Sequence, residues 1–495
     1  MKMRSLVWMC VLSSGAGAAQ SMEGMHHDHA AMQMQQPVHV DEKNDAGTLS
    51  YPIQQVQEPE ALDVRTGESL PAPELLKDVV GKPAMTLAQW LDLAEAHQPS
   101  LIEARAAVTR SEQQARQLAL PPNPVVGYSG EHIRGGNYHG GEQGAFLSQE
   151  IVLGRKLALR RDVARFEGKA NEIGIEVQRA RVHNDVAQRF FDALSAQALV
   201  VIHKRILKRA DDAQTNAHEL MRVGQADAAD VLKAEIQAEQ AKMEFVEAQR
   251  AFLASFGRLA ATAGVPAMAA QPLDGKLTEP PQMDVQDMLQ KNVEESPVVK
   301  QAMASIAVAE ALVKSARRES VPDLKLTAGE WYSGERLDGT TKAASWMGFA
   351  QAGVQLPLWN RNQGNVGAAK AELSRAQAAV VRTQMWTRER AEPIAQQYKQ
   401  AQFAAERYRT QMLPRARRAY ELEVMKYQQM GQAYPKVLEA QAMLYDLQLG
   451  YVKALHDEWA AAIALENFTL DGALDKPSSV GSDDGMRNLP TSAGN

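Results

Sequence analysis

Alternating apolar and polar residues predict two short β-strands in each half of the chain. In the clearest case, 345–358, apolar and small side chains occupy every second position, while Gln351 and Gln355 fall on the other side. A period of two is the repeat of a strand with one apolar and one polar face. Strands of about ten residues with this alternation have the length used in membrane-spanning barrels. The predicted strands cover residues 125–133, 145–153, 324–333 and 345–358.

Helical stretches precede each pair of strands. One helix is predicted to begin near Thr86 and to end before Pro121. Its counterpart begins near Asp284 and ends before Pro322. Both ends follow from proline, because its ring forces the preceding residue out of the helical conformation.

A very long helix follows each pair of strands, over residues 155–222 and 363–427. At 1.5 Å per residue, a helix of this length extends roughly 100 Å, so we expect coiled-coil rods rather than the helices of a globular core. Pro393 and Pro414 lie inside the second rod and predict a kink or a short break there. A shorter return helix follows each rod.

The two halves are copies of one pattern. The stretch "QPSLIEARAAVTRSEQQARQLALPPNPVV" matches "ESPVVKQAMASIAVAEALVKSARRESVPDLKL", and Pro99 and Pro297 are 198 positions apart. Gly264 and Gly472, which end the return helices, are 208 positions apart. Because the offset changes so little, the order and the lengths of the elements are duplicated.

The ends of the chain differ from its duplicated middle. The start "MKMRSLVWMCVLSSGAGAAQ" has the basic, apolar and small-residue regions of a signal peptide, so we expect an exported protein. The predicted organisation is a signal peptide over 1–18, a flexible Met/His-rich segment and extended lead-in over 19–83, repeats over 84–265 and 284–472, and a disordered tail over 473–495.

Composition excludes several functions. The 495 residues carry a formal charge of −6, and the basic residues show no interleaved aromatic platform, so a nucleic-acid partner is not expected. Cys10, the only cysteine, lies inside the predicted signal peptide, which leaves no disulfide or thiol ligand in the mature chain. No motif of a serine hydrolase, a nucleotide-binding loop or a zinc protease is present, and we expect no enzyme activity.

A metal-binding composition marks the N-terminal segment. The stretch "MEGMHHDHAAMQMQQ" combines thioether and imidazole groups, which suit copper and silver. We expect no resident cofactor, but transient Cu or Ag binding by this tail. The alternative is an unstructured polar tail whose composition is incidental. The candidate ligands are Met22, Met25, His26, His27, His29, Met32 and Met34.

Four strands cannot close a transmembrane barrel, since the smallest such barrels have eight. Oligomerisation therefore follows from the strand count. Three chains would supply twelve strands and, from their helices, a continuous wall.

The duplicated motifs resemble those of the TolC-like outer-membrane efflux ducts, and most closely the branch that serves heavy-metal resistance-nodulation-division pumps, for copper and silver or for cobalt, zinc and cadmium. The resemblance rests on "PPNPVVGYSGEH", "QEIVLGRK", "VQLPLWNRNQG", "RVGQADAADVLKAEIQ" and "YQQMGQAYPKVLEAQ". It implies a homotrimer with a twelve-stranded barrel in the outer membrane of a Gram-negative bacterium and a long α-helical tunnel in the periplasm. It also implies outer-membrane lipid, a periplasmic adaptor protein and an inner-membrane pump as partners.

The resemblance also implies roles for the turns between the rods and the return helices. The turns would lie at the periplasmic tip and dock the adaptor, although their glycines also serve as helix caps, and that alone is the alternative. Acidic residues just past the tip would ring the aperture, but a lysine stands where the family has an aspartate. The docking candidates are Val223, Gly224, Gln225, Ala226, Met430, Gly431, Gln432 and Ala433, and the aperture candidates are Asp230, Glu439 and Lys436.

Three functions are compatible with the sequence. The first is the outer-membrane channel of a tripartite efflux system, passively exporting heavy-metal ions, with copper and silver favoured by the tail. The second is a duct for organic drugs or dyes. The third is a periplasmic copper-binding coiled-coil protein, which leaves the duplicated strand pairs unexplained.

Overall fold

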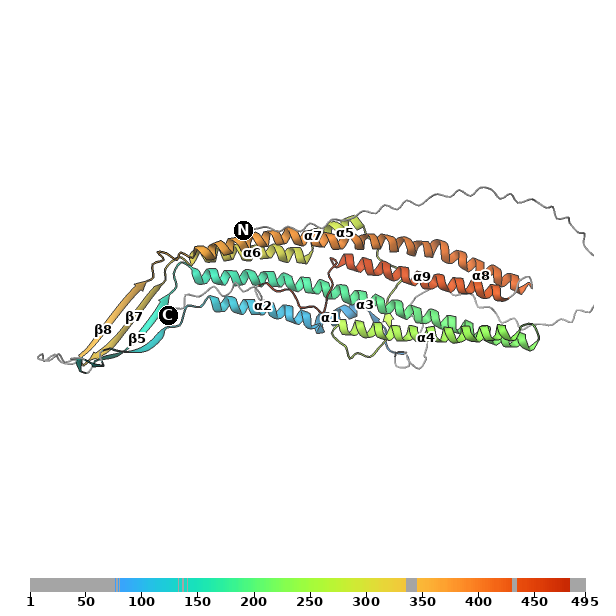
Figure 1. Cartoon of the computed structure of the whole chain (residues 1–495), viewed down its shortest axis with the longest axis horizontal. Helices are drawn as coiled ribbons and strands as arrows, with labels where there is room; N and C mark the ends of the chain where they lie inside the picture. The colour runs from blue at the N-terminus through green and yellow to red at the C-terminus, as the bar shows by residue number, and fades with distance from the viewer. Residues whose placement is uncertain are drawn as a thin grey trace, which may run out of the picture. The chain divides into compact units, whose positions relative to one another are not determined.

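We describe the protein from a computed structural model. The chain divides into two units, residues 1–58 and 59–495, and the fold described below is that of the second. The described residues are 76, 79, 81–131, 133–135, 138–139, 141–334, 345–429 and 434–480. The predicted signal peptide, most of the N-terminal segment and residues 481–495 lie outside them. Figure 1 shows two sets of strands and helices that repeat in the same order.

Each predicted leading helix is two helices in the structure. The first half has α1 (Leu87–His97) and α2 (Pro99–Leu118), and the second half has α5 (Val285–Glu294) and α6 (Pro297–Arg318). The prediction of one continuous helix in each half was wrong because a proline occupies the first position of α2 and of α6. The residues before these prolines have extended ψ values of 117° and 129°.

The predicted helix starts are capped as their sequences indicate. The Thr86 hydroxyl accepts a hydrogen bond from the backbone of Gln89, whose side chain bonds back to Thr86 and completes a capping box. In the second half, the Asp284 carboxylate accepts hydrogen bonds from the backbone of Gln286 and Asp287. The same helix start is therefore fixed by different side chains in the two repeats.

The four predicted strands form one antiparallel sheet. They are β2 (Val125–Glu131), β5 (Glu142–Ile151), β7 (Leu324–Ser333) and β8 (Ser345–Val354), in the order β2-β5-β7-β8. The central pair joins the two repeats, with Glu142 opposite Ser333 and Ile151 opposite Leu324. The last strand is shorter than predicted because its pairing with β7 ends at Val354, opposite Leu324, the first residue of β7.

Two short pairings accompany the main elements. A parallel pair of β1 (Met85–Thr86) and β6 (Leu273–Asp274) ties the start of the first repeat to the linker between the repeats. A small hairpin pairs β3 (Arg134–Gly135) with β4 (Tyr138–His139) beyond the end of β2. Sequence patterning predicts none of these two-residue strands.

Gly144 fixes how closely the strands of the two repeats approach. A side chain at this position of β5 would collide with the carbonyl oxygen of Glu330 and with the Cα atom of Trp331 on β7. We expect Gly144→Val to abolish most heat-modifiable, detergent-extracted protein, because the strands would be forced apart. The control is Gly353→Val in β8, where an added Cβ meets nothing within 4 Å. Equal yields of the two variants would contradict the pairing.

The rods match their predicted extents closely. The first is α3 (Lys156–Arg222), and its return helix is α4 (Ala228–Thr262). The second rod consists of α7 (Gln363–Arg407), a π-helical turn η2 (Tyr408–Met412) and α8 (Leu413–Gln428), followed by the return helix α9 (Tyr434–Glu466). With 67 residues, α3 extends about 100 Å.

The two prolines of the second rod have different effects. Pro414 is the second residue of α8, two positions after the π turn, and that turn is the short break predicted here. Pro393 lies inside α7, which continues as an α-helix on both sides of it. The short break predicted at this position is therefore absent, and the alternative, a kink, stays a prediction.

Aromatic side chains dominate the core that joins the repeats. Trp90 of α1 meets Phe256 of α4 edge to face, with the ring centres 5.5 Å apart. Phe191 of α3 stacks on Trp459 of α9 at 3.8 Å, so this contact crosses from the first repeat to the second. Because α3 contacts α4 and α2 as well as α6 and α9, it is the central helix of the structure.

The predicted disordered tail is ordered over its first residues. Ala473 is fully buried, and its carbonyl accepts hydrogen bonds from Ser100 and Gln178. Farther along, the backbone of Val480 exchanges two hydrogen bonds with the Asn171 amide. The prediction was wrong for 473–480, because side chains of the helices satisfy the backbone of this Gly/Ser/Pro-rich segment.

Candidate functional site

The first predicted docking turn is a capped reversal between α3 and α4. The backbone N–H groups of Gly224 and Gln225 donate to the carbonyls of Met221 and Leu220, at 3.1 and 2.8 Å. Gly224 has a φ of +76°, which favours glycine and completes a Schellman motif. An added Cβ at Gly224 would meet nothing within 4 Å, and Val223 is 66% exposed. The turn therefore presents backbone and small side chains to its surroundings, with Ala226 partly buried beside it.

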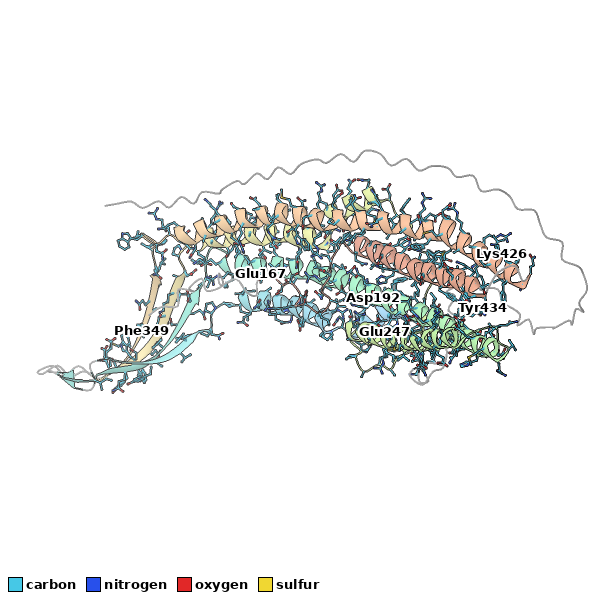
Figure 2. All side chains as sticks on the ribbon, turned by 45° about the vertical axis from the view of Figure 1, so that its right-hand side comes forward. Glu167, Asp192, Glu247, Phe349, Lys426 and Tyr434 are labelled. Atoms are coloured by element: carbon cyan, nitrogen blue, oxygen red, sulfur yellow. The ribbon has the colours of Figure 1, made fainter. Side chains whose placement is uncertain are left out.

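The second predicted docking turn falls outside the described residues at Met430, Gly431, Gln432 and Ala433. Its flanks are described, and the rings of Tyr427 and Tyr434 lie 5.3 Å apart across it. The Asn216 side chain donates a hydrogen bond of 3.3 Å to the Tyr434 hydroxyl, which ties the end of α3 to the start of α9. Figure 2 shows Lys426 and Tyr434 at the end of the helices far from Phe349 in the sheet.

The aperture candidates all pair with a charge on their own helix. Lys436 donates to Glu439 at 2.8 Å, and this contact lowers the pKa of Glu439 and raises the pKa of Lys436. In the first repeat, Asp230 lies 3.7 Å from Lys233. No ion pair joins Asp230 to Glu439 or Lys436 within the part of the chain that the structure describes. Each acid is thus partly compensated by a lysine three residues away.

A buried ion pair that the sequence analysis missed fixes the passage from sheet to rod. Lys156, at the start of α3, is 4% exposed, and its ammonium donates to Asp323 at 2.7 Å. The second carboxylate oxygen of Asp323 accepts the backbone N–H of Leu153 at 2.9 Å. Asp323 directly precedes β7, the first strand of the second repeat. Its side chain therefore joins the start of that strand pair to the segment that follows the strand pair of the first repeat.

The same passage has an unusual backbone in both repeats. Arg155 and Asn362 both have a φ of 60°, and each is the residue before a rod. A left-handed conformation is costly for arginine and tolerated by asparagine, whose amide here donates to the Ala316 carbonyl at 2.8 Å. The signal in the sequence was the recurrence of "LGRK" and "WNRNQG" at equivalent positions.

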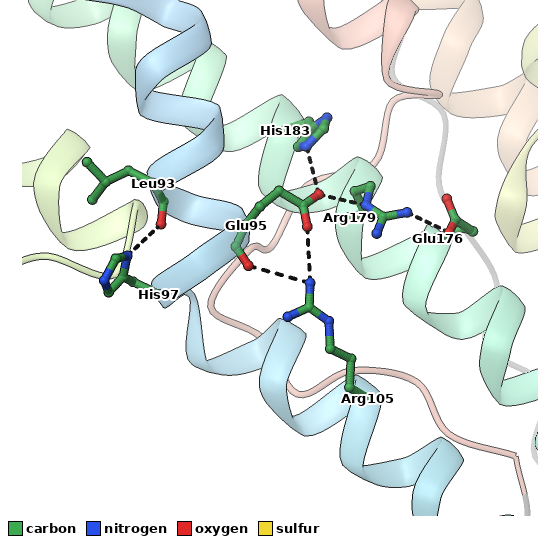
Figure 3. A network of polar contacts seen from close by, with 7 residues as sticks. All are labelled: Leu93, Glu95, His97, Arg105, Glu176, Arg179 and His183. Atoms are coloured by element: carbon green, nitrogen blue, oxygen red, sulfur yellow. Dashed lines mark hydrogen bonds and ion pairs between the residues drawn. The ribbon is translucent and has the colours of Figure 1, made fainter.

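Glu95 of α1 holds a polar network at the first helix junction. Its carboxylate accepts hydrogen bonds from Arg105 of α2 and from Arg179 and His183 of α3, as Figure 3 shows. The shortest of these contacts is 2.6 Å, to Arg179. The network joins α1, α2 and α3 at the break before Pro99, and we interpret it as structural.

The candidate metal ligands Met22, Met25, His26, His27, His29, Met32 and Met34 lie outside the described residues. Among the residues that are described, no three His, Cys, Asp or Glu side chains gather to hold a metal ion.

Comparison with known proteins identifies the family. The sequence profile of the outer membrane efflux protein family matches residues 90–265 and 288–469, which are the two repeats. The chain belongs to this family. It is therefore an outer-membrane efflux channel and a transport protein rather than an enzyme.

One relative by sequence and several solved structures align with most of the length of this efflux channel. The cobalt-zinc-cadmium resistance protein CzcC of Cupriavidus metallidurans is 24% identical over 404 residues, which cover 81% of this chain and 93% of that protein. Among solved structures, CusC matches with a TM-score of 0.63 and 16% identity, over 78% of this chain and 92% of that one. VceC of Vibrio cholerae matches with a TM-score of 0.61 and 18% identity, over 78% and 96%.

Proposed function

We propose that this efflux channel is a homotrimeric duct that passively exports heavy-metal ions. The observation that carries the trimer is the sheet, whose outer strands β2 and β8 have no partner within the described chain. Unpaired edges bearing exposed apolar side chains, such as Val126 at 77% and Trp346 at 69%, call for further strands and an apolar environment. Three copies give twelve strands, enough for a closed barrel.

Two independent features support the proposed heavy-metal cargo, although each favours different metals. The relative from Cupriavidus metallidurans is named for resistance to cobalt, zinc and cadmium, which supports a heavy metal. The Met/His stretch from Met22 favours copper or silver, since thioethers are soft ligands. We therefore propose a soft-metal duct whose N-terminal tail collects Cu(I) or Ag(I) weakly, with cobalt, zinc and cadmium as the second candidate cargo.

Metal tolerance tests the proposed cargo. A strain lacking this chain, with its pump and adaptor retained, should lose tolerance to copper or silver, and a version lacking residues 22–36 should lose part of it. Loss of tolerance for cobalt, zinc or cadmium alone would favour the second cargo. A change only for organic dyes would contradict a metal duct and leave the channel fold untouched.

The tips are the proposed docking sites of a periplasmic adaptor that links the duct to an inner-membrane pump. Gly224→Asn separates docking from capping, because asparagine tolerates the φ of +76° but adds a side chain to the exposed turn. We expect normal helix content and an adaptor affinity about tenfold lower, which corresponds to about 1.4 kcal/mol.

The matched control for the tip is Gly364→Asn near the start of α7, where an added Cβ also meets nothing within 4 Å. Binding of purified adaptor to the full chain in detergent measures both variants. If Gly224→Asn binds the adaptor as tightly as the unmodified chain, the glycine is a helix cap only.

Asp230, Glu439 and Lys436 remain the proposed aperture residues. Because Lys233 and Lys436 offset part of the acidic charge, we propose a weakly cation-selective opening rather than a strong electrostatic filter.

A further inference from the structure

A groove between α7 and α9 lies outside every role assigned above. It has a volume of about 940 Å³ and runs beside the linker between the two repeats. The π turn η2 forms one end of it, with Arg409 among the lining residues. π-Helical turns are rare and frequently mark functional sites. We call this feature the α7–α9 groove.

Glu458 is the unusual residue of the α7–α9 groove. Its side chain lines the groove, yet only 2% of the residue is exposed. No hydrogen bond or ion pair reaches its carboxylate from the residues that the structure describes. Removing an ionised carboxylate from water without a partner is costly, so proteins normally pair such groups.

The neighbouring charges do not compensate Glu458. Glu406, across the groove on α7, is itself held by Arg409 at 2.6 Å. Glu279 of the linker pairs with Lys276 at 3.0 Å. The remaining charged lining residue, Lys399, is exposed, and the hydroxyl of Tyr398 is used by the Pro281 carbonyl at 2.8 Å.

Apolar side chains form the rest of the wall near the buried carboxylate. Leu455 and Tyr451 precede Glu458 by about one and two helical turns on α9, and Phe403 stands 64% exposed on α7. The Arg407 guanidinium already lies over the Phe403 ring, 5.1 Å from its centre, so Phe403 offers a ligand its remaining apolar surface rather than a free π face. The groove thus offers an isolated negative charge beside an apolar and aromatic surface.

We propose that the α7–α9 groove binds an organic cation, in which an ammonium or amidinium group meets the Glu458 carboxylate and an apolar body covers Phe403 and Leu455. A charge-assisted hydrogen bond from the ligand would give the buried Glu458 carboxylate the partner that it lacks among the described residues. A bare metal ion fits less well, since no three ligating side chains gather among the described residues. The proposal does not depend on which cargo the duct exports.

Proton release is a consequence of this binding. Burial and the charge of Glu406 raise the pKa of Glu458 to about 7. A cation binds the ionised form, so its affinity should rise with pH. For a pKa of about 7, the ionised fraction grows from roughly 1% at pH 5 to roughly 90% at pH 8, an increase of nearly a hundredfold.

Benzamidine and benzamide make a matched pair of probes, because they share size and shape and differ in charge. Calorimetric titration of the full chain in detergent should show benzamidine binding at pH 8 with little proton release, and nearly a hundredfold weaker binding at pH 5, where the buffer takes up the proton that Glu458 releases. Glu458→Gln should lower the affinity at pH 8 at least tenfold, while Glu458→Asp should retain part of it.

Glu466→Gln is the control variant, since Glu466 is another carboxylate of α9 whose pKa is raised by partial desolvation, but it is exposed and does not line the groove. It should bind benzamidine as the unmodified chain does. The proposal is overturned if benzamide binds equally well, if Glu458→Gln with normal helix content keeps full affinity, or if the intact chain binds no benzamidine at pH 8.

Discussion

Asp323→Ala is expected to lower the free energy of unfolding by about 3–5 kcal/mol, because it leaves the Lys156 ammonium buried without a counter-charge. Lys156 is 4% exposed, and its contact with Asp323 is 2.7 Å. The backbone N–H of Leu153 would also lose its acceptor, which costs about 1 kcal/mol more. Denaturant unfolding of the detergent-solubilised chain, followed by helix content, measures the loss.

Two further variants separate charge from packing at this junction. Asp323→Asn keeps an acceptor for Leu153 but removes the charge, so it should be intermediate. Lys156→Met combined with Asp323→Leu removes both charges at similar volume and should recover all but the cost of about 1 kcal/mol for the Leu153 N–H left without its acceptor. A cost below about 1 kcal/mol for Asp323→Ala, or a double variant as unstable as the single one, would show that the pair does not hold sheet to rod.

Glu458→Gln is expected to stabilise the protein by about 3 kcal/mol at pH 8 and by less than about 1 kcal/mol at pH 5. The folded-state pKa of Glu458 is about 7, above its ordinary 4.5. Below pH 4.5 the carboxyl is neutral in both states and costs nothing. As the pH rises through 7, the unfolded chain keeps an ionised and solvated carboxylate, whereas folding must bury it, so the native state loses stability.

The comparison must be made between variant and unmodified chain at each pH, because His456 changes the baseline. The hydrogen bond that its ring N–H donates to the Asp192 carboxylate, at 2.8 Å, raises the pKa of His456. The stability from that pair is fully present below pH 6.5 and is lost as the pH rises through the raised value. Glu458→Gln and the unmodified chain share this loss of stability, so it cancels in the difference between them. A stabilisation by Glu458→Gln that is equal at pH 5 and pH 8 would contradict the burial of an ionised group.

Local patterns in the sequence were sufficient to predict the four long strands and the two rods. The alternation around Gln351 identifies β8, and the offset between Pro99 and Pro297 identifies the duplication. The same prolines held the signal for the breaks between the leading helices, since each forces its predecessor into an extended conformation. At Pro393, in contrast, packing against α9 and α5 keeps α7 continuous, which local preference does not predict.

The candidate site was only partly accessible from the sequence. Gly224 was identified because a reversal between long helices needs a positive φ, and the structure has one there. The Lys156–Asp323 pair joins residues 167 positions apart, and the isolation of Glu458 depends on how α7 packs on α9. Neither has a signature in a single sequence, because both arise from contacts between repeats or between distant helices.

Metal retention in living cells tests the central claim most directly. Cells with the matching pump and adaptor would be loaded with copper, silver, cobalt, zinc or cadmium, and the remaining metal measured over time by mass spectrometry, with and without this chain. We expect copper or silver to leave several times faster when the chain is present. Equal retention of all five metals, together with faster release of an organic dye, would contradict a heavy-metal duct.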